Sequence, residues 1–279
     1  MKKYTGSSPP ASKKKAIMMD KRERLVSKSN ELIQKGRFSL SASQQRLLIY
    51  LIAHIDPTLD HFEPVELGIR EYLDVCGSST NNYATIRRDI KALADQSFWL
   101  SSRGRDELHR WLSSDPMPTV NEGKGTITLC LSENMREHLL QLYMKGNYTK
   151  YQMLWILSLH SKYSIRLYEY LWSRLYNKFE KYEFEISLLE LQAVMGAEKY
   201  ANYGTFKQRV FNPSVAEINA YTDVSVTYTE CKTGRSVSSI FFSVLPTIDS
   251  ITGLELDIRA QQALNRSVFP SPPGKDEEQ

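Results

Sequence analysis

Two short stretches of this chain share one pattern: "YATIRRDI" spans residues 83–90 and "YGTFKQRV" spans residues 203–210. Each begins with tyrosine, has threonine third, and places apolar residues at its fourth and eighth positions. Apolar residues three to four positions apart predict an amphipathic helix. The basic residues between them then lie on the outward face. The chain therefore encodes the same helix twice, 120 positions apart.

The similarity extends upstream of both stretches. "VELGIREYLDVCG" (residues 65–77) and "FEISLLELQAVMG" (residues 184–196) have equal length and share two glutamates, a valine and the final glycine. Each begins with strand-like alternation and continues as a short helix that the glycine can end. A short helix is thus expected just before each copy of the repeated helix.

Longer helices are expected before each of these units. "SASQQRLLIYLIAHIDP" combines an amphipathic pattern with a capping-box pair, Ser41 and Gln44. The corresponding region of the second copy begins "YTKYQMLWILS" at Tyr148 and continues to "YEYLWSRLY". It predicts two helices with a break near residues 161–164.

A hairpin is expected after each copy. "VSVTYTE" and "VSSIFFSV" flank the turn "CKTGR", which predicts a β-hairpin. In the first copy "FWLSS" and "GKGTITLCL" take this place, separated by an insertion at residues 101–119. That insertion, with Arg103 and Arg105, either adds contacts to a phosphate backbone or forms a disordered loop.

The order helix, strand, helix, turn, helix, hairpin is that of a winged helix-turn-helix. We therefore expect an α+β protein of two tandem winged-helix domains with flexible termini. The predicted division is a basic flexible arm at 1–24, winged helices at 25–147 and 148–250, and a flexible acidic tail at 251–279.

Composition narrows the function. The 279 residues carry a net charge of +4, but residues 1–40 hold eleven Lys or Arg against three acids, which favours a polyanionic partner. No apolar run is long enough for a membrane span. Three widely separated cysteines indicate a reduced cytoplasmic protein without a metal site. Phosphate-loop, GxSxG and HExxH motifs are missing, so we expect neither an enzyme nor a cofactor.

The repeated helix supplies candidate DNA-binding residues. Spacing assigns Ile86, Ile90, Leu93, Phe206 and Val210 to the core. Arginine suits guanine and glutamine suits adenine in the major groove, and a capped helix N-terminus suits a phosphate. The candidates are Asn82, Thr85, Arg87, Arg88 and Lys91 in the first copy, Thr205, Lys207, Gln208 and Arg209 in the second, and Lys232 and Arg235 at the second wing.

A single basic helix is usually an ordinary solvated face. Here the basic face recurs at the same place in two helix-turn-helix contexts, which favours nucleic-acid binding.

The chain also resembles a known family. "LVSKSNELIQKGRFSLSASQQRLLIYLIAHI", "SKYSIRLYEYLWSRLYN", "EISLLELQAVMG" and "YGTFKQRVFNPSVAEINAYTDVSVTY" are similar to segments of plasmid replication initiators of the iteron-binding, theta-replication type. The similarity spans residues 25–244.

The resemblance implies a non-enzymatic protein that binds double-stranded DNA at the origin iterons of its plasmid as a monomer. It implies opening of adjacent AT-rich DNA and recruitment of the host initiator and helicase. A homodimer in equilibrium with the monomer would repress its own gene at an operator inverted repeat. The second domain would be the main iteron reader, and the first would contact DNA and dimerise.

The resemblance also assigns residues. It places Tyr203, with the second-copy candidates above, at the major groove, and it makes Lys162 and Ser164 phosphate contacts. Where relatives often have a run of arginines, this chain has Lys-Gln-Arg at 207–209, which should alter the base preference. Asn212 followed by Pro213 predicts a new helix there, and hence a short recognition helix.

Three alternatives remain open from the sequence. A transcriptional repressor with paired winged helices would bind a lone palindrome. A scaffold protein would show no DNA sequence preference, and a metal-dependent nuclease would nick DNA with magnesium.

Overall fold

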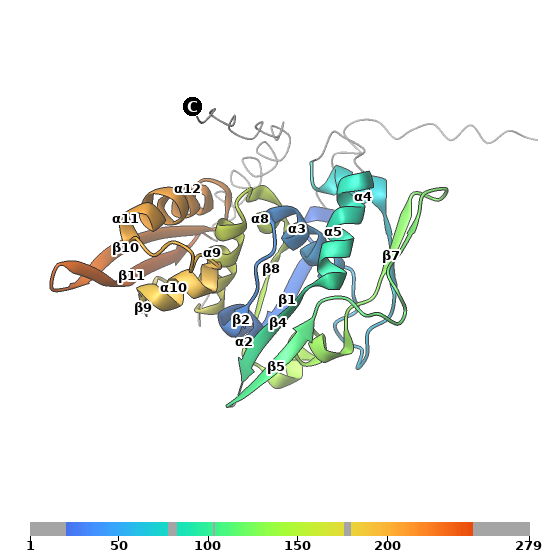
Figure 1. The fold of residues 1–279 in the computed structure, drawn as a ribbon, viewed down its shortest axis with the longest axis horizontal. Coiled ribbons are helices and arrows are strands. Elements are labelled where there is room, and N and C mark those ends of the chain that lie inside the picture. The colour runs from blue at the N-terminus through green and yellow to red at the C-terminus, as the bar shows by residue number, and fades with distance from the viewer. Residues whose placement is uncertain (1–20, 78–82, 103, 176–179, 248–279) are drawn as a thin grey trace, which may run out of the picture.

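The structure, a computed structural model, describes residues 21–77, 83–102, 104–175 and 180–247. The predictions for Asn82, for Arg103, for the tail 251–279 and for most of the arm 1–24 lie outside these ranges. The molecule is elongated, with the N-terminal half at one end and the C-terminal half at the other (Figure 1). Within the described ranges, no helix is both long and apolar enough to cross a membrane.

The N-terminal half carries the first helix-turn-helix, formed by α4 and α5. Gln44 and Ser41 form the predicted capping box at the start of α3. The elements in order are β1 (Leu25–Ser29), α2 (Asn30–Lys35), β2 (Gly36–Arg37), α3 (Ala42–Ile52), β3 (Val65–Gly68), α4 (Ile69–Val75), α5 (Tyr83–Asp95), β4 (Ser97–Ser102), β5 (Arg105–Arg110), β6 (Thr119–Asn121), β7 (Thr126–Leu129), η1 (Glu133–Met135), α6 (Arg136–Leu139), α7 (Leu142–Lys145) and β8 (Tyr148–Gln152).

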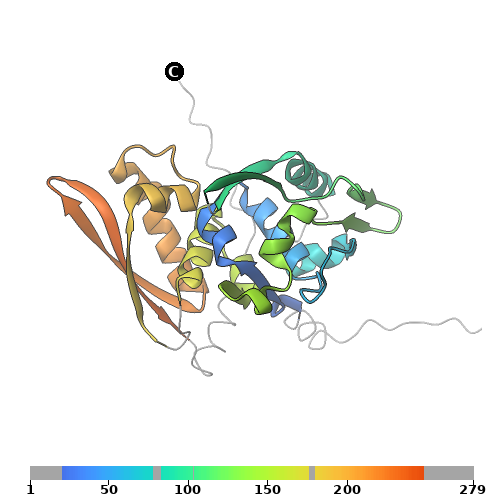
Figure 2. The same cartoon turned by 90° about the horizontal axis from the view of Figure 1, so that it is seen from below.

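The C-terminal half repeats the plan without an insertion. Its sheet has the order β10-β11-β9 and lies at one end of the molecule, with the helices on its inner side (Figure 2). The elements are α8 (Met153–Ser158), α9 (Lys162–Ser173), β9 (Tyr182–Ser187), α10 (Leu188–Met195), α11 (Tyr203–Phe206), the π-helical turn η2 (Lys207–Phe211), α12 (Asn212–Tyr221), β10 (Val224–Thr233) and β11 (Ser236–Pro246). Two tandem winged helices are therefore present, as expected.

The first wing differs from its prediction. "FWLSS" lies in β4, which pairs with β2 and β5, whereas "GKGTITLCL" contributes β7, which pairs with β3 and β6. The sheet β6-β7-β3 matches β10-β11-β9, so the wing is the β6–β7 hairpin. The insertion is not a disordered loop over residues 105–110, because β5 forms a hairpin with β4 there.

The second recognition helix is longer than predicted. Its backbone stays helical from α11 through η2 into α12, and the residues at both junctions have right-handed helical angles. Proline inside a helix lacks an N–H and its ring crowds the carbonyl four residues earlier. The wider π-helical turn just before Pro213 accommodates the ring, so the helix continues to Tyr221.

Residues 148–152 form a strand rather than the start of a helix. β8 pairs antiparallel with β1, so that Val26 faces Tyr151. Its burial alternates, with Thr149 and Tyr151 buried and Lys150 exposed, which is the period of a half-buried strand. The predicted break between the two following helices is confirmed, because α8 ends at Ser158 and α9 begins at Lys162.

One hydrophobic core runs through both halves, and buried polar groups join them. Lys28 of β1 donates to Glu169 of α9 at 2.7 Å, and both side chains are at most 4% exposed. Tyr151 also donates to Glu169. Arg166 of α9 donates to the carbonyl of Val194 in its own half and to that of Gly36 in the N-terminal half. The two winged helices are therefore packed as one body.

Candidate nucleic-acid interface

The first recognition helix, α5, has the two faces that the sequence predicts. Ile86, Ile90 and Leu93 are buried, and the candidates Arg87, Arg88 and Lys91 are exposed, with Thr85 half-buried. The exposed side chains follow one another along the helix at positions i, i+1 and i+4. This face can present three cations to a duplex.

The second recognition helix shows the same arrangement. Phe206 and Val210 are buried, while Gln208 and Arg209 are exposed and the candidates Tyr203, Thr205 and Lys207 are half-buried. In both helices, the residues that the sequence assigns to the core are therefore buried.

Asn202 caps the N-terminus of the second recognition helix. Its side chain accepts a hydrogen bond from the backbone N–H of Thr205 at 3.0 Å. We did not single out Asn202 from the sequence, although an asparagine precedes the repeat in both copies, at 82 and 202. An asparagine at this position is typical of a helix N-cap.

Both wings carry cations at their tips. Lys232 and Arg235 are exposed on either side of Gly234, whose φ of 64° explains the need for glycine. The first wing turns at Gly125, also at φ 64°, and exposes Lys124. Lys124 was missed because the first wing was misplaced, although "EGKG" at 122–125 puts a lysine beside turn glycines as "KTGR" does.

Each recognition helix pairs one cation with an acid of its own wing. Lys207 Nζ lies 2.5 Å from Glu230 of β10, and the Tyr203 hydroxyl donates to the same carboxylate oxygen at 2.8 Å. These two hydrogen bonds hold the pKa of Glu230 below its ordinary value. In the first copy Arg87 pairs with Glu122, next to the end of β6. Neither acid was predicted, because nothing in the local sequence places Glu122 or Glu230 beside these cations.

The structure contradicts the phosphate contact predicted for Ser164. Its side chain is fully buried, although Lys162 and Tyr163 before it are half-buried. The carboxylate of Glu217 accepts from the backbone N–H groups of His160 and Ser161, at 2.6 and 3.3 Å, so an acid rather than a free anion site stands just before α9. Lys162 is half-buried and donates to Ser39 at 3.2 Å.

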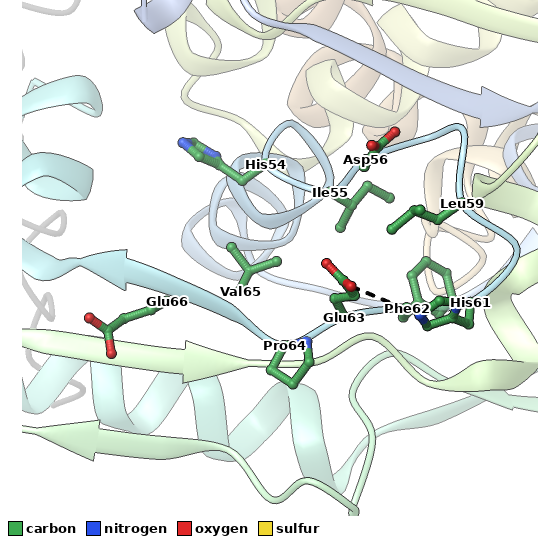
Figure 3. A pocket seen from close by; sticks show the side chains of 10 residues that line it. All are labelled: His54, Ile55, Asp56, Leu59, His61, Phe62, Glu63, Pro64, Val65 and Glu66. Carbon is green, nitrogen blue, oxygen red and sulfur yellow. Dashed lines mark ion pairs between the residues drawn. The ribbon is translucent and has the colours of Figure 1, made fainter.

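A pocket lies between the end of α3 and the start of β3 (Figure 3). Its lining includes the acids Asp56, Glu63 and Glu66, and His61 pairs with Glu63 at 4.0 Å. Acidic side chains would repel phosphate. Over the described part of the chain, no three His, Cys, Asp or Glu side chains are grouped to hold a metal ion.

Two helix-turn-helix units, each with an exposed basic helix face and a hairpin wing, define the class of the molecule: a tandem winged-helix DNA-binding protein. The chain belongs to the initiator replication protein family. The family model described as "Initiator Replication protein, WH1" matches residues 25–172, and that described as "Initiator Rep protein, WH2" matches residues 187–244.

Individual relatives agree with this assignment. A replication initiation protein of Escherichia coli is 26% identical over 247 residues, which cover 84% of this chain and 74% of that protein. The crystal structure of the Pi initiator protein in complex with iteron DNA has a similar fold, with a TM-score of 0.70 at 19% identity over 82% of this chain and 99% of that one.

Proposed function

We propose that this chain is a plasmid replication initiator that binds the iterons of its origin sequence-specifically and without enzymatic activity. The observation that carries the proposal is the recurrence, in both winged helices, of an exposed basic helix face beside a wing with a cationic tip. The family membership supports the initiator role. The fold shared with an initiator bound to iteron DNA supports this choice of ligand.

In the proposed complex the two recognition helices enter successive major grooves of one duplex, roughly 34 Å apart. Lys207, Gln208 and Arg209 contact base edges from the second helix, and the first helix contributes Arg87 and Arg88. The wings lie at opposite ends of the molecule (Figure 1), where Lys124 at one end and Lys232 and Arg235 at the other reach the flanking backbone. Thr85, Lys91, Tyr203 and Thr205 complete the proposed interface.

The binding proposal predicts a steep salt dependence. With about six to ten phosphates neutralised, log K should fall against log salt with a slope of about −5 to −9. A titration of the full chain with a duplex carrying direct repeats from beside its gene, against a shuffled duplex, checks this. Equal affinity for both duplexes near physiological salt contradicts sequence-specific binding, and preference for a lone palindrome favours a dedicated repressor.

The finer roles rest on the same proposal. The monomer binds iterons, opens the adjacent DNA with the host initiator and helicase, and acts in the bacterial cytoplasm. The dimer represses the gene. We assign dimerisation and additional DNA contacts to the first domain, residues 25–147. The second domain, residues 148–250, is the main iteron reader.

The β4–β5 hairpin is the surface we propose for the dimer. β5 is an edge strand in the order β2-β4-β5. Trp99 and Leu108 face each other across the hairpin and are 56% and 48% exposed. An exposed apolar pair beside an open strand edge favours association with a second sheet.

Trp99→Glu should therefore shift the chain toward the monomer without unfolding it, because the side chain contributes little to the core. Sedimentation equilibrium measures the shift, with Tyr143→Glu, at another exposed aromatic residue, as the matched control. Equal dimer fractions in both variants and the wild type would assign the dimer to another surface.

A further inference from the structure

The pairing of a recognition-helix cation with a wing acid occurs in both halves. Arg87 and Lys207 occupy the same position, the fifth, of the repeated stretch. Their partners, Glu122 and Glu230, lie 35 and 23 residues downstream. Because the spacing differs while the contact is the same, the fold rather than a sequence motif brings each pair together.

The neighbouring tyrosines strengthen the correspondence. Tyr203, the first residue of the repeat, donates to Glu230. In the first half the hydroxyl of Tyr83 lies 3.6 Å from the position that a Cβ on Gly125 would occupy, so it also faces its wing. The first and fifth residues of the repeat therefore face the wing in both halves.

Folding stability does not explain why these pairs recur. The side chains of Lys207 and Glu230 are 36% and 23% exposed, and those of Arg87 and Glu122 are 51% and 59% exposed. Ion pairs this exposed contribute little to stability, since solvent screens them. A carboxylate at a DNA-binding surface also repels the phosphates that the surface attracts.

The pairs do affect binding to DNA of any sequence. Non-specific affinity depends on how many cations are available to neutralise phosphates. A lysine paired with a glutamate adds no net charge to the surface. The position of its ammonium group is set by the glutamate rather than by the nearest phosphate. At the correct site, the lysine can instead contact a base edge from a fixed position.

We propose that Glu230 is a specificity-determining residue, which positions Lys207 for base contact and suppresses its attraction for phosphates at other sequences. Glu122 acts in the same way on Arg87. The inference rests on the proposed DNA-binding function and adds to it a role for acidic residues within the interface.

Glu230→Gln tests this inference, because the amide keeps an acceptor for Tyr203 but removes the charge. With Lys207 released to one further phosphate, affinity for a random-sequence duplex at 0.1 M salt should rise about fivefold to tenfold, and its log–log salt slope should steepen by about 0.9. Affinity for a duplex that the wild type selects from a randomised library should not rise. The ratio of specific to non-specific affinity should therefore fall about fivefold to tenfold.

Glu183→Gln is the matched control. Glu183 pairs with Lys181, but it lies on β9, the strand of the sheet farthest from β10. This variant makes the same change in net charge and should leave the ratio unchanged.

An unchanged ratio in Glu230→Gln, or an equal rise on both duplexes, overturns the inference. Failure of the wild type to select any sequence would instead contradict the proposed function itself. Thermal unfolding of each variant confirms that the comparison is made on folded protein.

Discussion

Lys28→Met should lower the free energy of unfolding by about 3–5 kcal/mol, because it removes the buried ammonium that donates to the carboxylate of Glu169. Lys28 lies 2.7 Å from Glu169, and both side chains are almost fully buried. Burial lowers the pKa of Lys28, and the nearby carboxylate opposes that shift by favouring the charged ammonium. The pair joins β1 of the first half to α9 of the second.

Urea denaturation of the full chain measures the loss. The double variant Lys28→Met with Glu169→Gln should recover part of it, because residue 169 is then neutral and the Tyr151 hydroxyl keeps an acceptor. Recovery should be incomplete, since the buried guanidinium of Arg166 loses the carboxylate that favours its charge. A loss below about 1 kcal/mol in the single variant, the range of exposed ion pairs, would show that the pair is solvated and does not hold the halves together.

Lys207→Ala with Arg209→Ala should weaken specific DNA binding by about 1–3 kcal/mol for each lost base contact, and thus roughly 2–6 kcal/mol together. In the proposed complex both side chains face the major groove from the second recognition helix. The loss has two parts, because removing Lys207 also leaves the Glu230 carboxylate facing DNA without its cation, although Tyr203 still donates to it.

The matched comparison is Arg87→Ala with Arg88→Ala, in the first recognition helix, which should weaken binding less. Fluorescence anisotropy with one specific duplex at fixed salt measures both affinities. If both double variants bind as tightly as the wild type, the recognition helices are wrongly assigned.

Much of the fold was predictable because its signals are local. The repeat located both helix-turn-helix units, and periodicity placed Ile86, Ile90, Phe206 and Val210 in the core, as the structure shows. The second wing was predictable because its strands are adjacent in the sequence and turn at Gly234.

The predictions were wrong where the structure depends on contacts between residues far apart in the sequence. The first wing was misplaced because the β4–β5 hairpin lies in the sequence between α5 and the β6–β7 hairpin. α12 does begin at Asn212, as predicted, but the recognition helix is not short, because the Asn212–Pro213 pattern does not reveal the π-helical turn that joins α12 to α11. Ser164 follows a helix N-cap, as a phosphate contact would, but its side chain is buried and the acid Glu217, distant in sequence, binds the N–H groups just before α9.

The interface was only partly predictable for the same reason. Its cations are visible in the sequence, since basic residues recur on one face of both helices. Glu122 and Glu230 are not, because an acid gains a role at this surface only when the fold brings it to a particular cation.

Hydroxyl-radical footprinting of one chain on a duplex with a single specific site tests the central claim, that both recognition helices bind the same DNA. The account predicts two protected segments about one helical turn apart on one face of the duplex. Arg87→Ala with Arg88→Ala should weaken protection of one segment, and Lys207→Ala with Arg209→Ala that of the other. The claim is contradicted if only one segment is protected and only one of the two double variants weakens that protection.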